Sequence, residues 1–216
     1  MPGILYHLSF AELIYQRLST RFPELDKATF IAGNLIPDLA IDKFRSHYRV
    51  SASVEGLFRP DTEAASADLL SELDAVKLGI FCHLYLDARF IESFLIPEFK
   101  WNREDGTVIR VADGSVRSIA EFFSDRGLYG AYTEINGLLL RDGHIDTEIL
   151  DLIPDKLPEC GIRVFDTRRE KTWRTELNEY ISENRPYSGN LLDYGKLWSK
   201  LLLFADSLAA LLNSIF

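Results

Sequence analysis

The feature that most constrains the fold of this chain is the run LGIFCHLYLDARF at residues 78–90. It belongs to a long helical pattern over residues 62–99, interrupted near Ser71, and its apolar side chains occupy almost every face of the helix. A helix of this kind is stable in water only when other helices cover it on all sides. The run therefore predicts a multi-helix bundle in which residues 78–90 are buried.

The other periodic segments also favour helix. Residues 9–21 form an amphipathic pattern in which Ser9 is the expected N-cap and Glu12 completes a capping box. The stretch DKATFIAGNLIPDLA begins helically but should end near Asp38, because Pro37 opposes further helix. Four more helical patterns cover residues 126–141, 146–153, 166–184 and 190–214.

One stretch departs from the helical pattern. Asp-Gly turn signals at 105–106 and 113–114 surround a short β-branched run, which predicts a hairpin or irregular insertion near residues 100–115. No internal repeat and no Pro/Gly/Ser-rich linker divides the chain. The expected fold is a single all-α domain, residues 1–216, with this one insertion.

Charge and cysteine content exclude some classes of protein. The chain has 33 acidic and 24 basic residues and a net charge of −9, with no basic cluster. A long nucleic-acid groove lined with Lys and Arg is therefore not expected. Cys82 and Cys160 are far apart and lack CxxC spacing, which argues against a disulfide framework or a thiolate zinc site.

The two ends of the chain bear on its location. The first residues lack a basic region, a continuous apolar region and a cleavage site, so they do not resemble a signal peptide. The apolar tail is interrupted by Lys200 and Asp206, which argues against a transmembrane segment. We expect a cytoplasmic protein.

Two polar residues interrupt the central apolar run. His83 and Asp87 are four residues apart, so a helix brings their side chains to one face, about a turn from each other. They are either a buried hydrogen-bonded pair or two ligands of one cation. Gly79, one turn earlier on that face, leaves room for a close neighbour or an ion.

Three upstream residues are further candidates. His7 precedes the first predicted helix, Asp38 ends the segment GNLIPD, and His47 lies in the polar segment SHY. Taken singly, Asp38 would be a turn carboxylate, His47 an exposed loop histidine, and His7 a residue packed under the first helix or lying at the surface.

Taken together in chain order, the early histidine, GNLIPD, SHY and GIFCHLYLD resemble the zinc-dependent phospholipase C family. The family pattern runs from an N-terminal His through Gly-x-x-x-Pro-Asp and Ser/Thr-His-aromatic segments to His-x-x-x-Asp on a central helix. The resemblance covers roughly residues 1–95. Related single-strand-specific nucleases share the arrangement and chemistry.

The resemblance implies an all-α fold that holds metal ions between its helices. By motif position, Asp38, His47, His83 and Asp87 are the expected ligands of a first ion, and His7 is expected to hold a neighbouring ion. The aspartate matching Asp38 is also a candidate general base. Two neutral imidazoles and two carboxylates suit a divalent, zinc-like ion that activates water.

The chain lacks some of the family's histidines. No histidine follows Asp87 until His144, which precedes Glu148 with His-x-x-x-Glu spacing but is expected in a surface loop. The centre is therefore expected to be mononuclear, or dinuclear with a carboxylate such as Glu92 or Asp42.

The expected function is metal-dependent hydrolysis of a small phosphoester or lipid-like substrate, with one or two divalent ions, most simply zinc. The alternative is a non-catalytic protein that kept the fold and binds a metal or a small molecule. A third possibility is a helical interaction module in which these polar residues only form buried hydrogen bonds.

Overall fold

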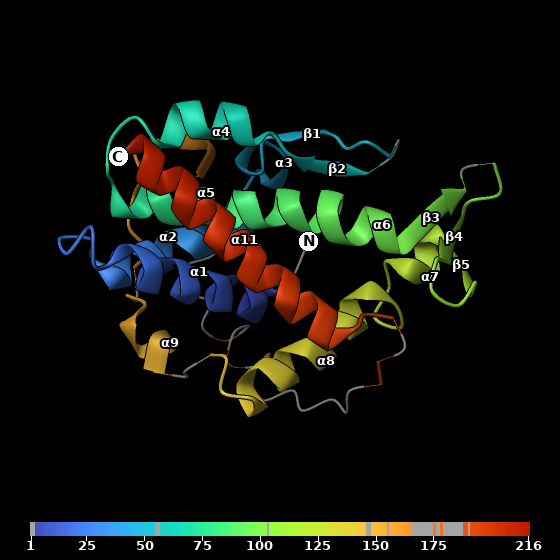
Figure 1. Cartoon of the computed structure of the whole chain (residues 1–216). Coiled ribbons are helices and arrows are strands. Elements are labelled where there is room, and N and C mark those ends of the chain that lie inside the picture. The colour runs from blue at the N-terminus through green and yellow to red at the C-terminus, as the bar shows by residue number, and fades with distance from the viewer. Residues whose placement is uncertain are drawn as a thin grey trace.

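The computed structural model is mostly helical, with two small antiparallel sheets (Figure 1). The expected all-α fold is therefore corrected to a mostly helical fold with two small sheets. None of the described helices is long and apolar enough to cross a membrane. The structure describes residues 3–54, 57–102, 104–145, 148–154, 156–165, 175, 178, 188–189 and 191–216.

The elements follow one another in chain order as helices interrupted by two groups of short strands. The helices are α1 Ile4–Leu18, α2 Lys27–Leu39, α3 Lys43–Ser46, α4 Thr62–Leu69, α5 Ala75–Phe90, the π-helix η1 Ile91–Leu95, α6 Ile96–Glu98, α7 Ile119–Phe122, α8 Leu128–Arg141, α9 Glu148–Leu152, the 3-10 helix η2 Arg163–Phe165 and α11 Tyr194–Ile215. The strands are β1 Arg49–Ser51, β2 Phe58–Pro60, β3 Phe99–Asn102, β4 Thr107–Arg110 and β5 Val116–Ser118.

Helix α5 lies at the centre of the bundle, as the apolar run predicts. It contacts α1, α2, α4 and α11, and α11 crosses it diagonally in Figure 1. Within residues 78–90 only Arg89 is exposed, and its guanidinium lies over the ring of Tyr85. Burial of the other side chains by neighbouring helices supplies the main apolar stabilisation of this part of the chain.

Two glycines allow α2 and α5 to pack at very short range. A Cβ atom on Gly79 would lie 2.1 Å from the main-chain oxygen of Phe30, and one on Gly33 would lie 2.3 Å from that of Val76. Any side chain at these positions would force the helices apart. The space beside Gly79 is thus filled by helix α2. The sequence predicts either a close neighbour or an ion at this position, and the structure shows the close neighbour.

The rod formed by α5 continues through η1 and α6 to Glu98, so the π-helical turn carries one extra residue within a longer helix. The hairpin expected near residues 100–115 follows as β3 and β4, with Trp101 opposite Val108, and β5 extends it to three strands. The break expected near Ser71 separates α4 from α5.

A second hairpin was not expected from the sequence. Strands β1 and β2 pair with Arg49 opposite Pro60, between α3 and α4. Each strand has three residues, too few for an alternating pattern to be distinguished from loop. Tyr48, with a positive φ of 45°, turns the chain from α3 into β1.

The predicted start of the first helix is wrong. Helix α1 begins at Ile4, with Gly3 as N-cap, so Ser9 is an interior residue whose hydroxyl donates to the main-chain oxygen of Leu5 at 2.9 Å. Serine bonds to the preceding turn in this way when it lies inside a helix. As a consequence, His7 belongs to α1 itself rather than to a segment before it.

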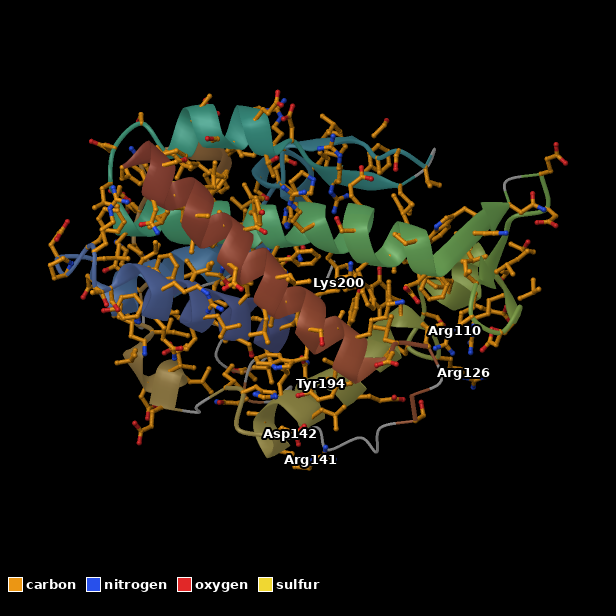
Figure 2. All side chains as sticks on the ribbon, in the orientation of Figure 1. Arg110, Arg126, Arg141, Asp142, Tyr194 and Lys200 are labelled. Carbon is orange, nitrogen blue, oxygen red and sulfur yellow. The ribbon has the colours of Figure 1, made fainter. Side chains whose placement is uncertain are left out.

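The C-terminal part contains α8, α9 and α11 close to the predicted ranges. Arg141 donates to Asp142 at 2.8 Å where α8 ends, and Tyr194 at the start of α11 lies beside them in Figure 2. The helix predicted at 166–184 lies outside the described residues, Thr175 and Asn178 excepted.

Candidate metal centre

Five polar side chains from four parts of the chain meet inside the bundle. His7 comes from α1, Asp38 from the last turn of α2, His47 from the residue after α3, and His83 and Asp87 from α5. Their ligand atoms form two overlapping groups, His7–His83–Asp87 and Asp38–His47–His83, each within 4.8 Å. The structure therefore brings together all five residues selected from the sequence.

Local sequence explains where Asp38 and His47 lie. Helix α2 starts at an N-cap, Asp26, which accepts from Thr29, and it continues through Pro37 to Leu39, so Asp38 lies in its last turn. Four residues later Asp42 caps α3, which ends at His47. Two helix ends therefore present the aspartate and the histidine to the same place.

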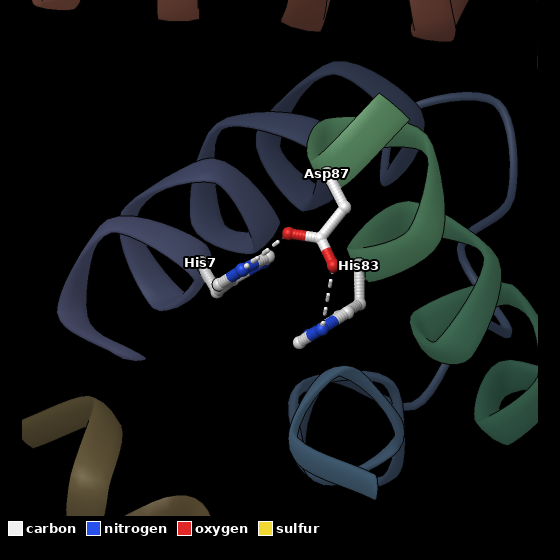
Figure 3. Close-up of side chains that lie close together, drawn as sticks. All are labelled: His7, His83 and Asp87. Carbon is white, nitrogen blue, oxygen red and sulfur yellow. Dashed lines mark ion pairs between the residues drawn. The ribbon is translucent and has the colours of Figure 1, made fainter. Parts of the chain in front are cut away.

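Asp87 is the hub of the cluster, because each of its oxygens faces a different group. Its Oδ2 atom lies 3.6 Å from Nε2 of His47 and 3.6 Å from Nε2 of His83. Its Oδ1 atom lies 3.3 Å from Nε2 of His7 (Figure 3). The carboxylate thus lies between the imidazole of His7 and those of His47 and His83.

Asp38 and the two stacked imidazoles complete the arrangement. The Oδ1 atom of Asp38 lies 3.6 Å from Nε2 of His47, and its Oδ2 atom lies 4.0 Å from Nε2 of His83. The rings of His7 and His83 are parallel, with centroids 3.8 Å apart and an interplanar angle of 7°. Three Nε2 atoms and two carboxylates therefore converge on a small volume.

Main-chain oxygens fix the orientation of two of the histidines. Nδ1 of His83 lies 2.8 Å from the main-chain oxygen of Asn34, and Nδ1 of His47 lies 2.9 Å from that of Lys43. A carbonyl oxygen only accepts, so each Nδ1 donates its proton. When such an imidazole is neutral, its Nε2 is unprotonated and directed into the cluster, the orientation that metal-ligating histidines adopt.

The cluster is buried, and several of its polar atoms have no hydrogen-bond partner among the described residues. The side chains of His7, His47, His83 and Asp87 are 1% exposed or less. Among the described residues, no hydrogen-bond partner was found for the Nε2 atoms of the three histidines or for either oxygen of Asp87. A buried carboxylate without hydrogen bonds is costly unless a cation compensates it.

The charge state of the cluster follows from its burial. Burial opposes ionisation of Asp87, yet His83 and His7 hold its pKa well below the ordinary value. Burial also opposes a charge on His83, but the carboxylates of Asp87 and Asp38 raise its pKa above 6.5. Burial and the nearby His83 lower the pKa of His7 to about 4.

Asp38 is the member of the cluster nearest to solvent. Its side chain is 23% exposed. Burial would raise its pKa, but the neighbouring His47 and His83 outweigh this and hold the pKa below the usual range. Both carboxylates are therefore charged near neutral pH, and together with neutral histidines they match the charge of one divalent cation.

The distances between the polar atoms are longer than those of a hydrogen-bonded pair and compatible with those between ligands of one ion. Nε2 of His83 and Oδ2 of Asp87 are 3.6 Å apart, longer than a hydrogen bond of about 2.7–3.2 Å. Around a tetrahedral ion with bonds of about 2.0–2.1 Å, neighbouring ligand atoms lie about 3.3–3.4 Å apart. The observed separations of 3.3 to 4.0 Å lie at or slightly above that spacing.

Several candidates for completing a second ion site are occupied elsewhere. Glu92 accepts from Arg59 at 2.8 Å and from the hydroxyl of Ser53 at 2.8 Å. Asp42 accepts from the main-chain nitrogens at the start of α3. Neither carboxylate joins the cluster, because Glu92 is engaged by the hairpin residues and Asp42 by the main chain of α3.

His144 also lies outside the cluster. Its ring stacks on Trp198 of α11, with centroids 3.7 Å apart, and it is half-buried rather than exposed. His47 likewise differs from an exposed loop histidine, since it is fully buried. Stacking on Trp198 is a tertiary contact that the local sequence around His144 does not reveal.

Sequence reasoning missed the residues that orient the ligands. Lys43 could have been found from its spacing, because the carbonyl four residues before His47 lies beside it at the end of a helix. Asn34 acts on His83 through its main-chain oxygen, which every residue has, so no side-chain pattern points to it. Ser46 donates to the main-chain oxygen of Pro37 at 3.1 Å and ties α3 to the end of α2.

Comparison of the chain with protein-family models, with curated proteins and with solved structures gave no significant match. Its function is therefore inferred from the arrangement of its own side chains.

Proposed function

We propose that this protein is a metal-dependent hydrolase of phosphoesters that resembles the zinc-dependent phospholipase C family. The observation that carries the proposal is the convergence of three buried Nε2 atoms and a buried carboxylate, found without hydrogen-bond partners among the described residues. Imidazole nitrogens and carboxylate oxygens without hydrogen-bond partners are suitable ligands for a divalent cation of the zinc type. The motif order in residues 1–95 is consistent with it.

The five side chains would divide between one or two ions. Asp38, His47, His83 and Asp87 would hold the first, and His7 with the second oxygen of Asp87 would help to hold a neighbour. When bound, such an ion polarises a phosphoryl oxygen and makes water a better nucleophile near neutral pH. The main-chain oxygens of Asn34 and Lys43 would keep the histidines aligned for this task.

Asp38 would be the general base. Among the five site residues its side chain is the most exposed, so it is the carboxylate that a water molecule arriving from solvent meets first. Its lowered pKa keeps it charged, so a side-chain oxygen can orient that water; transfer of the proton to so weak a base would depend on the ion making the water more acidic.

The surface near Asp38 suggests the kind of substrate. Ile41, Phe44 and Phe58 are exposed by 56%, 54% and 48%, and the rings of Phe44 and Phe58 meet at 6.3 Å. Ile41 and Phe44 follow Asp38 closely in the chain. We assign to this apolar surface the apolar part of a small phosphoester or lipid-like substrate.

The test compares the wild-type protein with Asp38→Asn. Both are freed of metal, loaded with zinc or manganese, and assayed for phosphodiesterase and phosphomonoesterase activity, with bound metal measured in parallel. We expect metal in the wild type and a fall in kcat of about 100-fold or more in the variant, the scale of general-base catalysis. A wild type that binds no such ion contradicts the proposal.

The second candidate is a non-catalytic protein that binds a metal or a small molecule. It is favoured by the engagement of Glu92 and Asp42 elsewhere, which leaves no second complete ligand set among the described residues. Wild type and Asp38→Asn that both hold metal and are equally inert would support this candidate over the hydrolase.

A further inference from the structure

A basic residue, Lys43, the first residue of α3, lies beside the cluster. Its Nζ atom lies 3.8 Å from Oδ1 of Asp38, and Nε2 of His47 lies 3.6 Å from the same oxygen. Among the described residues, Lys43 is the only lysine or arginine found in an ion pair with one of the five cluster residues. The ammonium of Lys43 and Nε2 of His47, a candidate ligand atom, therefore both lie beside the same oxygen of Asp38.

We propose that the ammonium group of Lys43 binds the phosphoryl group of the substrate at this centre. This rests on the proposed phosphoester hydrolysis and adds a residue to it. Lys43 would then be a substrate-binding residue in addition to orienting His47 through its carbonyl oxygen.

The position of Lys43 suits an arriving anion. Its side chain is 48% exposed and Asp38 is 23% exposed, whereas the other four side chains of the cluster are essentially buried. Asp38 is thus the member of the cluster that solvent reaches, and the ammonium of Lys43 lies beside it. The bond from His47 to the carbonyl oxygen of Lys43 holds the main chain of this lysine in place beside the ligand.

Charge balance gives the ammonium a role. With neutral histidines, the two carboxylates of the cluster cancel the charge of one divalent ion, which leaves no net positive charge to attract a phosphoryl anion. The engagement of Glu92 and Asp42 elsewhere keeps them out of a second ligand set. Lys43 supplies the missing unit of positive charge, and a charge-assisted contact with a phosphate oxygen is stronger than a neutral hydrogen bond.

The competing explanation is an ordinary surface ion pair between Lys43 and Asp38, which would contribute little to stability. The two explanations differ in what happens when phosphate is added. An ion pair alone predicts no dependence of phosphate binding on Lys43. Phosphate binding by Lys43 predicts that removing its charge weakens binding while the metal content stays the same.

Arg45 provides a matched control on the same helix. Its Nε atom lies 3.6 Å from Oδ2 of Asp42, and its side chain is 74% exposed. Arg45→Gln removes one positive charge from α3, as Lys43→Gln does, but at a position paired with Asp42 rather than Asp38. Lys43→Arg keeps a charge at the proposed position.

The experiment uses the full chain, loaded with zinc and then freed of unbound zinc. Inorganic phosphate is titrated into each protein by calorimetry, and zinc content is measured on the same samples. We expect equal zinc content throughout, phosphate binding weakened by about 10- to 100-fold in Lys43→Gln, partial recovery in Lys43→Arg, and no change in Arg45→Gln. KM for a phosphomonoester should rise in parallel.

The possible failures are distinguishable. If Lys43→Gln binds zinc, phosphate and phosphomonoester as the wild type does, Lys43 is only a surface ion-pair partner, and the proposed hydrolase function is unaffected. An equal loss of phosphate binding in Arg45→Gln also overturns the role of Lys43, because it attributes binding to the general charge of α3. A wild type that holds no zinc overturns the hydrolase function and the role of Lys43 with it.

Discussion

The main-chain oxygen of Asn34 on α2 lies 2.8 Å from Nδ1 of His83 on α5, so the helix contact itself sets the orientation of a candidate metal ligand. This contact depends on Gly79, one turn before His83, where a Cβ atom would lie 2.1 Å from the main-chain oxygen of Phe30. The glycine found in the apolar run is therefore connected to the candidate metal centre through the packing of two helices.

Replacement of Gly79 should damage both stability and metal binding. In Gly79→Ala the new methyl group meets main-chain atoms that cannot move independently, so we expect a loss of about 1–3 kcal/mol in the free energy of unfolding. Zinc affinity should also fall, because α5 must shift relative to Asn34. Urea denaturation and a zinc competition titration measure the two effects.

Gly195→Ala is the control for that experiment. A Cβ atom there would meet only Oδ1 of Asp193, at an ordinary 3.5 Å, in the first turn of α11. We expect no loss of stability, since alanine is the better helix former. If Gly79→Ala were as stable as Gly195→Ala, the close packing of α2 on α5 would not matter for the centre.

Removal of the metal should lower the melting temperature. An ion that binds only the folded protein, at a concentration of 100 times its dissociation constant, adds about 2.7 kcal/mol to the free energy of unfolding. This corresponds to a rise in melting temperature of roughly 5–10 °C for a chain of this size. A chelator should remove this increment from the wild type, and His83→Ala should lack it. Calorimetry with and without zinc measures both.

His144→Ala is the control for the effect of the metal. Its ring stacks on Trp198 away from the cluster, so this variant should lose stability equally with and without zinc and keep the full zinc increment. The same behaviour in His83→Ala would instead show that His83 is a buried hydrogen-bonding residue without a metal.

Zinc affinity should rise with pH. In the metal-free protein the pKa of His83 is raised above 6.5, mainly by Asp87 acting against burial, so zinc must displace a proton from this histidine. The lowered pKa values of His7, Asp38 and Asp87 leave these groups deprotonated near neutral pH. Affinity should therefore fall with decreasing pH, by about tenfold per unit for each proton displaced.

Titrations at pH 6, 7 and 8, in two buffers that differ in ionisation enthalpy, measure the affinity and the number of protons released. Binding that is equally tight at the three pH values, without proton release, would show that His83 is not a ligand.

Glu92 should matter for stability but not for the metal. In Glu92→Gln the half-buried pair with Arg59 and the bonds from Ser53 are weakened, so we expect a loss of about 1–2 kcal/mol with unchanged zinc content. Elemental analysis of the purified variant, with urea denaturation, measures both. Loss of zinc from Glu92→Gln would make this carboxylate a ligand after all.

Phe44 should affect apolar substrates selectively. In Phe44→Ser we expect KM for a naphthyl phosphoester to rise by about three- to tenfold, because apolar surface is lost from the proposed binding face. KM for a methyl phosphoester should stay the same. Val116→Ser removes an equally exposed apolar side chain on the distant strand β5 and should change neither value.

The sequence predicts the centre of the fold better than its edges. An almost uninterrupted apolar run has few ways to be buried, so the position of residues 78–90 follows directly from it. The prediction for Ser9 is wrong because the same local sequence can place a serine at the N-cap or inside a helix. Only the start of α1 at Ile4 distinguishes the two positions. Three-residue strands leave no periodic signal.

The candidate site was found because its side chains recur in a recognisable order. Its geometry was not predictable, because the groups that orient His83 and His47 are main-chain oxygens brought close by tertiary packing and by a helix end. The role of Glu92 was also beyond sequence reasoning, since its partners Arg59 and Ser53 come from the unexpected hairpin and the residues that follow β1.

The π-helical turn at Ile91–Leu95 lies between the candidate metal centre and the three-stranded sheet. Such a turn holds one inserted residue within a single turn, so deleting a single residue there would restore a regular α-helix and leave the parts of the helix on either side in register. His83 and Asp87, which precede the turn, would keep their places. One codon can therefore be lost or gained in this stretch over evolutionary time while the sheet and the candidate ligands on α5 both keep their places.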